Sequence, residues 1–144
     1  MADLQRRNFT STSRRRFNRA EAITVDAYRM RLAKHMADNT ALPPIAYMAF
    51  GDGGHHADLT PKPPSAGAVA LAHEVLRKPL AAITQEDAFS TTGKGVIDAA
   101  ELIGARISEA ALLDASGQLV GLKNFAPKLK ESDERYEISI KLRF

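Results

Sequence analysis

The sequence contains no cysteine and no tryptophan, and only 6% of its residues are aromatic. Without cysteine the chain has no disulfide, no thiolate metal ligand and no cysteine nucleophile. With so few aromatic residues, a core has to be built mainly from alanine, leucine, isoleucine and valine. No apolar run approaches the roughly 20 residues of a membrane-spanning helix. The N-terminus lacks the apolar segment of a secretory signal. We therefore expect a protein made in a cytoplasm and not inserted into a membrane.

Motifs for catalysis and nucleotide binding are also missing. The sequence has no GxSxG, no HExxH and no GxxxxGK[ST]. The glycine-rich GDGG at 51–54 does not complete a GxGxxG pattern, and the prolines that follow it oppose the helix N-terminus that a phosphate site needs. No pair of carboxylates is spaced for general acid–base chemistry. These absences predict a protein that is not an enzyme and binds no cofactor.

The segment IAYMAFGDGGHHADLTPKPPS gathers four possible metal ligands, Asp52, His55, His56 and Asp58. Adjacent histidines in extended chain point to opposite faces, so they do not readily bind one ion together. A symmetric oligomer could still collect one histidine from each subunit on its axis. The favoured interpretation is a chain reversal, because glycine permits positive φ and Asp-Gly pairs form tight turns. We expect no metal site within one chain.

Two further polar residues stand in apolar surroundings. His73 lies within AVALAHEVL, which favours a buried structural histidine over a functional one. Glu109 lies within ISEAALLD, where it is either on the solvent face of a strand or the partner of an arginine such as Arg77 or Arg106.

Positive charge is concentrated at the N-terminus. Residues 1–20 hold six arginines against one aspartate, a balance of +5, whereas the remaining residues hold 14 Lys and Arg against 16 Asp and Glu, a balance of −2. We interpret residues 1–21 as a basic arm that is either flexible or docks on a protein. Nucleic acid is the less favoured partner, because the arm has no interleaved aromatic residues and no recognition motif.

Hydrophobic periodicity predicts an α+β fold. A helix is expected within residues 22–40, where apolar side chains recur at helical spacing before Asp-Asn-Thr and Pro-Pro end it. Its broad apolar coverage suggests that more than one face is buried. A mainly antiparallel, sandwich-like β domain is expected over residues 41–144. It includes a strand at Ile45–Phe50, one short helix within Ala66–Lys78 that can turn extended near Glu74–Arg77, and a strand at Leu80–Thr84.

The C-terminal half supplies the clearest strand patterns. Two apolar runs, at Ile107–Leu113 and 118–125, are separated by Asp-Ala-Ser-Gly, which predicts a β-hairpin. From Tyr136 to Phe144 apolar and polar residues alternate, which is typical of a strand with one buried face.

Three motifs occur in an order that resembles a known family. A strand runs into GDGG at 48–54, a proline-rich loop leads to LAHEVLR at 71–77, and ISEAALLDASGQL follows at 107–119. This order resembles the N-terminal attachment module of bacteriophage tail-collar and tail-fibre proteins, over roughly residues 22–144. The resemblance implies a β-rich module in which the GDGG loop lies at a subunit or partner contact. Because the sequence stops at Phe144, we expect the attachment module without a fibre shaft.

The resemblance implies a structural virion protein located in the tail or baseplate and made in the host bacterial cytoplasm. Its expected role is that of a baseplate or collar component, which attaches tail fibres by protein–protein contacts within an oligomer. The expected partners are copies of itself, most simply a trimer, together with baseplate or tail-tip proteins and the tail fibre. A receptor- or glycan-binding tail module and a tail-fibre assembly factor remain alternatives. The partner-binding residues expected are Arg14, Arg15, Arg16, Tyr28, Met30, Asp52, His55 and His56.

Overall fold

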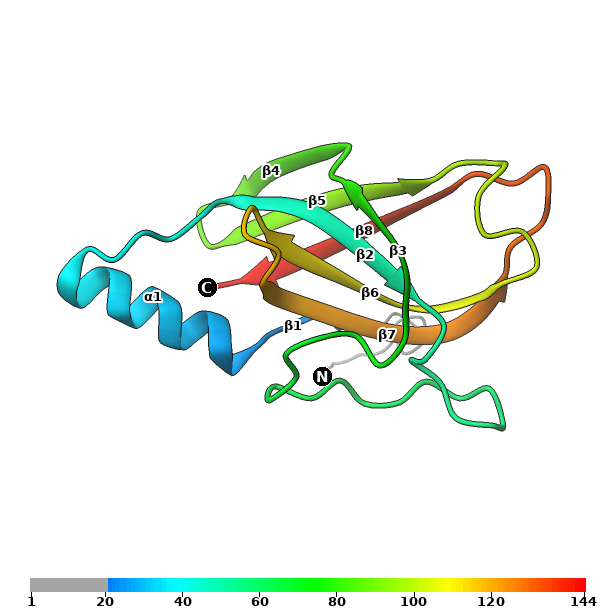
Figure 1. Ribbon diagram of the computed structural model, residues 1–144, viewed down its shortest axis with the longest axis horizontal. Helices are drawn as coiled ribbons and strands as arrows, with labels where there is room; N and C mark the ends of the chain where they lie inside the picture. The colour runs from blue at the N-terminus through cyan, green and yellow to red at the C-terminus, as the bar shows by residue number, and fades with distance from the viewer. Residues whose placement is uncertain (1–20) are drawn as a thin grey trace, which may run out of the picture.

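Residues 21–144, which the computed structural model describes, form two antiparallel β-sheets packed face to face, with one helix outside them (Figure 1). One sheet has the strand order β1-β7-β6-β2-β3 and the other the order β4-β5-β8. This confirms the predicted α+β class with a sandwich-like β domain. Along the chain the elements are β1 (Ile23–Thr24), α1 (Asp26–Asp38), β2 (Ile45–Gly51), β3 (Glu74–Pro79), β4 (Ala82–Asp87), β5 (Ser90–Ile97), β6 (Arg106–Asp114), β7 (Leu119–Leu129) and β8 (Tyr136–Arg143).

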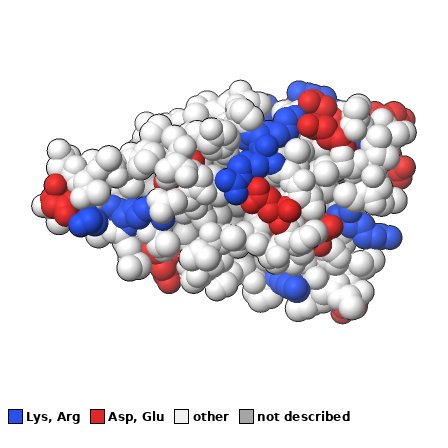
Figure 2. All heavy atoms as spheres, in the orientation of Figure 1, with Lys and Arg blue, Asp and Glu red and all other residues white. Residues whose placement is uncertain are grey.

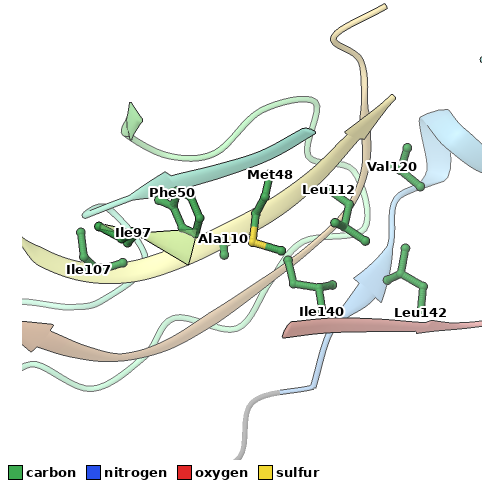
Figure 3. Packing of buried hydrophobic residues seen from close by; sticks show 9 residues of the cluster. All are labelled: Met48, Phe50, Ile97, Ile107, Ala110, Leu112, Val120, Ile140 and Leu142. Carbon is green, nitrogen blue, oxygen red and sulfur yellow. The ribbon is translucent and has the colours of Figure 1, made fainter. Parts of the chain in front are cut away.

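The main core lies between the two sheets. Two glycines of β5 allow the sheets to approach closely: a Cβ added at Gly95 would lie 2.5 Å from the Met48 sulfur, and one at Gly93 would lie 2.6 Å from Leu112 Cδ2. Larger residues in these places would push the sheets apart, as close-packed cores tolerate little extra volume. Figure 3 shows the fully buried side chains that fill this space, which are Met48, Phe50, Ile97, Ile107, Ala110, Leu112, Val120, Ile140 and Leu142.

A second apolar cluster covers the outer face of the five-stranded sheet. Strand β6 contributes to both clusters, since Ala110 and Leu112 face the other sheet while Ala111 and Leu113 face outward. Strands that are buried on both faces are typically continuous in their hydrophobicity, which explains the unbroken run in this strand. The outer cluster includes Val25 and Leu71, so the loop between β2 and β3 forms part of a third layer.

The predicted hairpin forms between β6 and β7. The carboxylate of Asp114 accepts hydrogen bonds from the backbone N–H groups of Ser116 (3.0 Å) and Gln118 (2.9 Å), and from the Ser116 hydroxyl. Gly117 has φ of +88°, a conformation that other residues adopt at a cost. The turn residues thus fix the register of the two strands, as the sequence predicted.

The short helix expected within Ala66–Lys78 is not formed. Residues 66–73 make turns and bends, and β3 then pairs antiparallel with β2, with Arg77 opposite Ala49. Helix propensity of this segment is overridden by strand pairing and by hydrogen bonds from the N–H groups of Ala72 and His73 to the Glu109 carboxylate. The next strand, β4, begins at Ala82 instead of the predicted Leu80.

Helix α1 spans Asp26–Asp38, within the range expected for it, and is preceded by the short strand β1. Asn39 ends the helix in the left-handed conformation, and its N–H donates to the carbonyl of His35 at 2.8 Å. We expect more than one face of this helix to be buried, but no residue of α1 is buried in the part of the chain that the structure describes. The helix extends from one end of the sandwich (Figure 1).

Candidate interaction surfaces

The GDGG segment is a tightly packed reversal after β2. Its glycines are required by space: a Cβ at Gly51 would lie 2.4 Å from the Glu109 carboxylate, and one at Gly54 would lie 2.3 Å from the carbonyl oxygen of Ser108. The side chain of Asp52 points away and is partly exposed. The segment is therefore a structural junction between β2, β6 and the loop that follows, as the chain-reversal interpretation predicted.

The buried side chain of Glu109 stabilises this junction by hydrogen bonds. Its side chain is 1% exposed, and its carboxylate accepts hydrogen bonds from the backbone N–H groups of Gly53 (2.9 Å), Ala72 (2.9 Å) and His73 (2.8 Å). Both expectations for Glu109 are wrong, since it does not face solvent and pairs with neither Arg77 nor Arg106. A carboxylate that accepts several backbone N–H groups ties chain segments together strongly, and here both ends of the 52–73 loop are tied to one side chain.

The neighbouring histidines are held apart. The hydroxyl of Ser108 is bound to the N–H of Gly54 at 2.8 Å and lies 2.7 Å from Nδ1 of His55, whereas His56 is exposed. Ser108 is fully buried and already has two partners, so this Ser–His contact is structural and presents no accessible nucleophile. Within residues 21–144 no three His, Asp or Glu side chains are placed to hold a metal ion.

Asp52 and His73, at the two ends of the 52–73 loop, form an exposed ion pair. Nδ1 of His73 contacts Oδ1 of Asp52, and the hydrogen bond and the negative charge of Asp52 raise the pKa of His73 above 6.5. The expectation that His73 is buried is wrong, because its side chain is 69% exposed. His73 lies at a bend just before β3, so its apolar neighbours in sequence do not surround it.

We expect the free energy of unfolding to fall slightly as pH rises above 6.5, through loss of the Asp52–His73 pair. A histidine whose pKa is higher in the folded state stabilises the fold fully below its unfolded pKa, and this contribution is lost as pH rises through the folded pKa. Urea unfolding between about pH 5.5 and about pH 8.5 measures the effect. The Asp52→Asn variant should lose less stability over this interval than the wild type; an equal loss in both proteins would contradict the assignment.

A second surface lies along α1, where an open apolar groove of about 800 Å³ runs between the helix and the loop at 64–66. Tyr28, Leu32 and Met36 recur every four residues and so form one stripe along the groove. Phe144 also lines the groove, and its ring centroid lies 6.5 Å from that of Tyr28. Met36 and Phe144 are 77% and 57% exposed, which is unusual for apolar side chains gathered on one surface.

A few polar contacts hold α1 in place. Nη2 of Arg31 donates to the carbonyl of Leu119 at 2.8 Å and lies 3.6 Å from the buried carboxylate of Asp114. The guanidinium also stacks 5.4 Å from the centroid of the Tyr28 ring. Arg31 therefore orients the helix over the β6–β7 turn. Tyr28 is partly buried and packs against both apolar clusters, and Leu32 is also partly buried, whereas Met36 is exposed.

The predicted partner-binding residues fall into separate places. Tyr28 lines the α1 groove, and Met30 is 71% exposed on the same helix outside the groove. Asp52, His55 and His56 belong to the GDGG junction and do not line the groove. The three predicted arginines, Arg14, Arg15 and Arg16, lie outside the described residues.

Sequence reasoning missed the other residues that line the groove, which are Ile23, Thr24, Arg29, Leu32, Ala33, Met36, Pro64, Ala66, Arg143 and Phe144. The spacing of 28, 32 and 36 was a usable signal. No local pattern indicates that the C-terminus and the 64–66 segment meet this helix, because those contacts join residues far apart in the sequence.

The α1 groove is lined by two cationic side chains, Arg29 and Arg143, among its apolar residues. Acidic and basic side chains lie side by side on the face shown in Figure 2, among larger uncharged areas. In the part of the chain that the structure describes, no helix has the length and hydrophobicity to cross a membrane.

Comparisons of the chain with protein-family models, with curated proteins and with solved structures give no match.

Proposed function

We propose that this chain is a structural protein of a bacteriophage tail, a baseplate or collar component that attaches tail fibres by protein–protein contacts within an oligomer. The observation that carries the proposal is the uncovered helix α1, a 13-residue helix with no buried residue beside an apolar groove. The order of the sequence motifs supports the tail assignment, and the β-sandwich supplies the rigid body that an attachment module needs.

An isolated helix of 13 residues is marginally stable in water, and helices in proteins are stabilised mainly by packing. Against residues 21–144 helix α1 is only partly buried, so a partner that covers the stripe of Tyr28, Leu32 and Met36 would complete its environment. We assign this partner as a second copy of the chain. The groove of about 800 Å³ and the exposed side chains of Met36 and Phe144 lie on one surface, and a symmetric contact between copies uses the same patch on both subunits.

Oligomerisation suits attachment to a tail. Identical weak contacts repeated around a symmetry axis combine by avidity, so each one can be modest. The firmly tied 52–73 loop forms one wall of the groove through Pro64 and Ala66. The groove is therefore largely preformed, which lowers the entropic cost of association.

The proposal predicts that the chain forms an oligomer. It also predicts that a charged residue substituted into the groove disrupts this oligomer. The wild-type chain at micromolar concentration should have a mass of two or more times 15.7 kDa, and three times this value for a trimer. Met36→Glu and Phe144→Glu should each shift the protein to monomer, because a carboxylate buried in an apolar contact is strongly unfavourable. Light scattering coupled to size-exclusion chromatography measures the mass.

Ile103→Glu is the matched control, because Ile103 is 56% exposed and does not line the groove. This variant should keep the oligomer. A monomeric wild type, or an oligomer insensitive to both groove variants, would contradict the self-association. Mass spectrometry of tails purified from the phage that encodes the chain tests the virion role separately, and absence of the chain from finished tails would contradict it.

A further inference from the structure

A second pocket, which shares no lining residue with the α1 groove, lies between β7 and β8. It has a volume of about 370 Å³ and is lined by residues of β6, β7, β8 and the segment before β8. Its walls combine basic and aromatic side chains, and those that matter for its chemistry are Lys123, Phe125, Lys128, Arg135, Tyr136 and Glu137.

The pocket carries an excess of positive charge. Its lining has three cations against the single carboxylate of Glu137, a formal balance of +2. That carboxylate is already engaged, because Nη1 of Arg135 donates to it at 2.6 Å and Lys94 lies 3.5 Å away. Among residues 21–144, neither Lys123 nor Lys128 has a carboxylate within ion-pair distance. Two ammonium groups thus face the pocket without a protein counter-ion in the described chain.

Lys123 is the more unusual of these two lysines. It is half-buried beside Phe125, with Nζ 6.0 Å from the ring centroid, and burial lowers its pKa. The charge of Glu21 acts in the opposite direction but does not cancel the effect of burial. Burying an ammonium group without a partner is unfavourable, so an anion that enters the pocket would relieve this cost.

The aromatic walls are fixed in place. The Tyr136 hydroxyl lies 2.6 Å from the carbonyl of Leu129 and 2.9 Å from the Glu134 carboxylate, and burial together with Glu134 raises its pKa to about 12. Nζ of Lys128 lies 5.0 Å from the centroid of the same ring. The hydroxyl is thus engaged outside the pocket, and the ring lies beside two cations, because Nζ of Lys130 is also 5.9 Å from its centroid.

We propose that this pocket binds a small organic anion, a carboxylate or phosphate carried on a single six-membered ring. The anionic group would lie between Lys123 and Lys128, and the ring would pack on Phe125 and Tyr136. A volume of about 370 Å³ is at the lower end of small-molecule sites, which suits one ring and excludes larger ligands from full burial. Ligand pockets typically combine apolar walls with a few placed polar groups.

Titration of the full chain with glucuronate, glucose 6-phosphate and benzoate, followed by amide NMR, tests this site. At least one of these ring-bearing anions should shift amide signals of β7 and β8 around the pocket, with saturation at a dissociation constant of about 1 mM or lower. Neutral glucose should cause no such shifts. Glucuronate and benzoate distinguish a sugar ring from an aromatic one, and glucose 6-phosphate distinguishes phosphate from carboxylate.

Lys123→Met should raise the dissociation constant of the probe that binds at least about tenfold, since a charge-assisted contact is lost. Lys34→Met is the matched control, because Lys34 is exposed on α1 and pairs with Asp38, and it should leave binding unchanged. Absence of shifts with all three anions, equal shifts with glucose, or equal weakening by both substitutions would overturn the proposal. If Lys123→Met does not fold, Lys128→Met takes its place with the same expectation. The α1 variants should bind the probe like the wild type, which keeps this test separate from that of the oligomer.

Discussion

Replacing Glu109 with alanine should lower the free energy of unfolding by about 3–5 kcal/mol. The substitution removes a carboxylate that accepts three backbone hydrogen bonds, from Gly53, Ala72 and His73, at a position that is 1% exposed. Each N–H group left buried without a partner costs about 1–3 kcal/mol. These costs do not simply add, because the 52–73 loop can move and expose some of the groups to water.

Glu109→Gln separates the hydrogen bonds from the volume of the side chain. The amide oxygen can still accept from two of the N–H groups, but the amide nitrogen is a donor and cannot accept from the third. We expect a loss smaller than that of the alanine variant and still above about 1 kcal/mol. Glu86→Ala is the control, because Glu86 is exposed and pairs with Lys141 at the surface, where such pairs contribute little. Urea unfolding of the four proteins measures the differences, and equal stability of Glu109→Ala and Glu86→Ala would refute the role given to Glu109.

Glu109 also affects the α1 groove, because it holds the 52–73 loop that forms one wall of the groove. Both ends of the 52–73 loop are tied to this carboxylate, and Pro64 and Ala66 in the middle of the loop form one wall of the groove. The N–H of Asp26, at the start of α1, also donates to the carbonyl of Ala66 at 2.7 Å. A protein without Glu109 should therefore self-associate more weakly even at a urea concentration where its sheets remain folded.

The strands with regular patterns could be predicted from the sequence. The alternation from Tyr136 onward gives β8, whose Ile140 and Leu142 are buried in the core. The Asp-Ala-Ser-Gly turn gives the β6–β7 hairpin, because its hydrogen bonds are made within a few residues. In these segments the local chemistry and the tertiary contacts favour the same structure, and a pattern of short range is then sufficient.

The features that sequence reasoning missed depend on distant contacts. The segment at 66–78 has helix-forming residues, yet pairing with β2 and the bonds of Ala72 and His73 to Glu109 make it turn and then extend. Glu109 resembled a solvent-facing strand residue because nothing nearby in sequence shows that three N–H groups converge on it. The α1 groove likewise joins residues from opposite ends of the described chain, such as Tyr28 with Phe144.

Gly54→Ala should lower the free energy of unfolding by about 3 kcal/mol. The added Cβ would lie 2.3 Å from the carbonyl oxygen of Ser108 and 2.9 Å from Cβ of Glu109. Neither atom can easily retreat, because β6 is paired on both sides, with β2 and with β7. The glycine must move instead, and this movement would strain the hydrogen bond of 2.8 Å from its N–H to the Ser108 hydroxyl.

Gly67→Ala is the matched control for this prediction, because it makes the same chemical change in the same loop. A Cβ at Gly67 would meet nothing nearer than the Ser65 hydroxyl at 3.7 Å, and the residue is exposed. Its stability should stay within about 0.5 kcal/mol of the wild type, or rise slightly because alanine restricts the unfolded chain. Thermal and urea unfolding of the two variants measure the contrast. If both glycines tolerate alanine equally, the GDGG segment is not the close-packed junction described above, and its glycines require a reason other than the backbone and carboxylate that surround them.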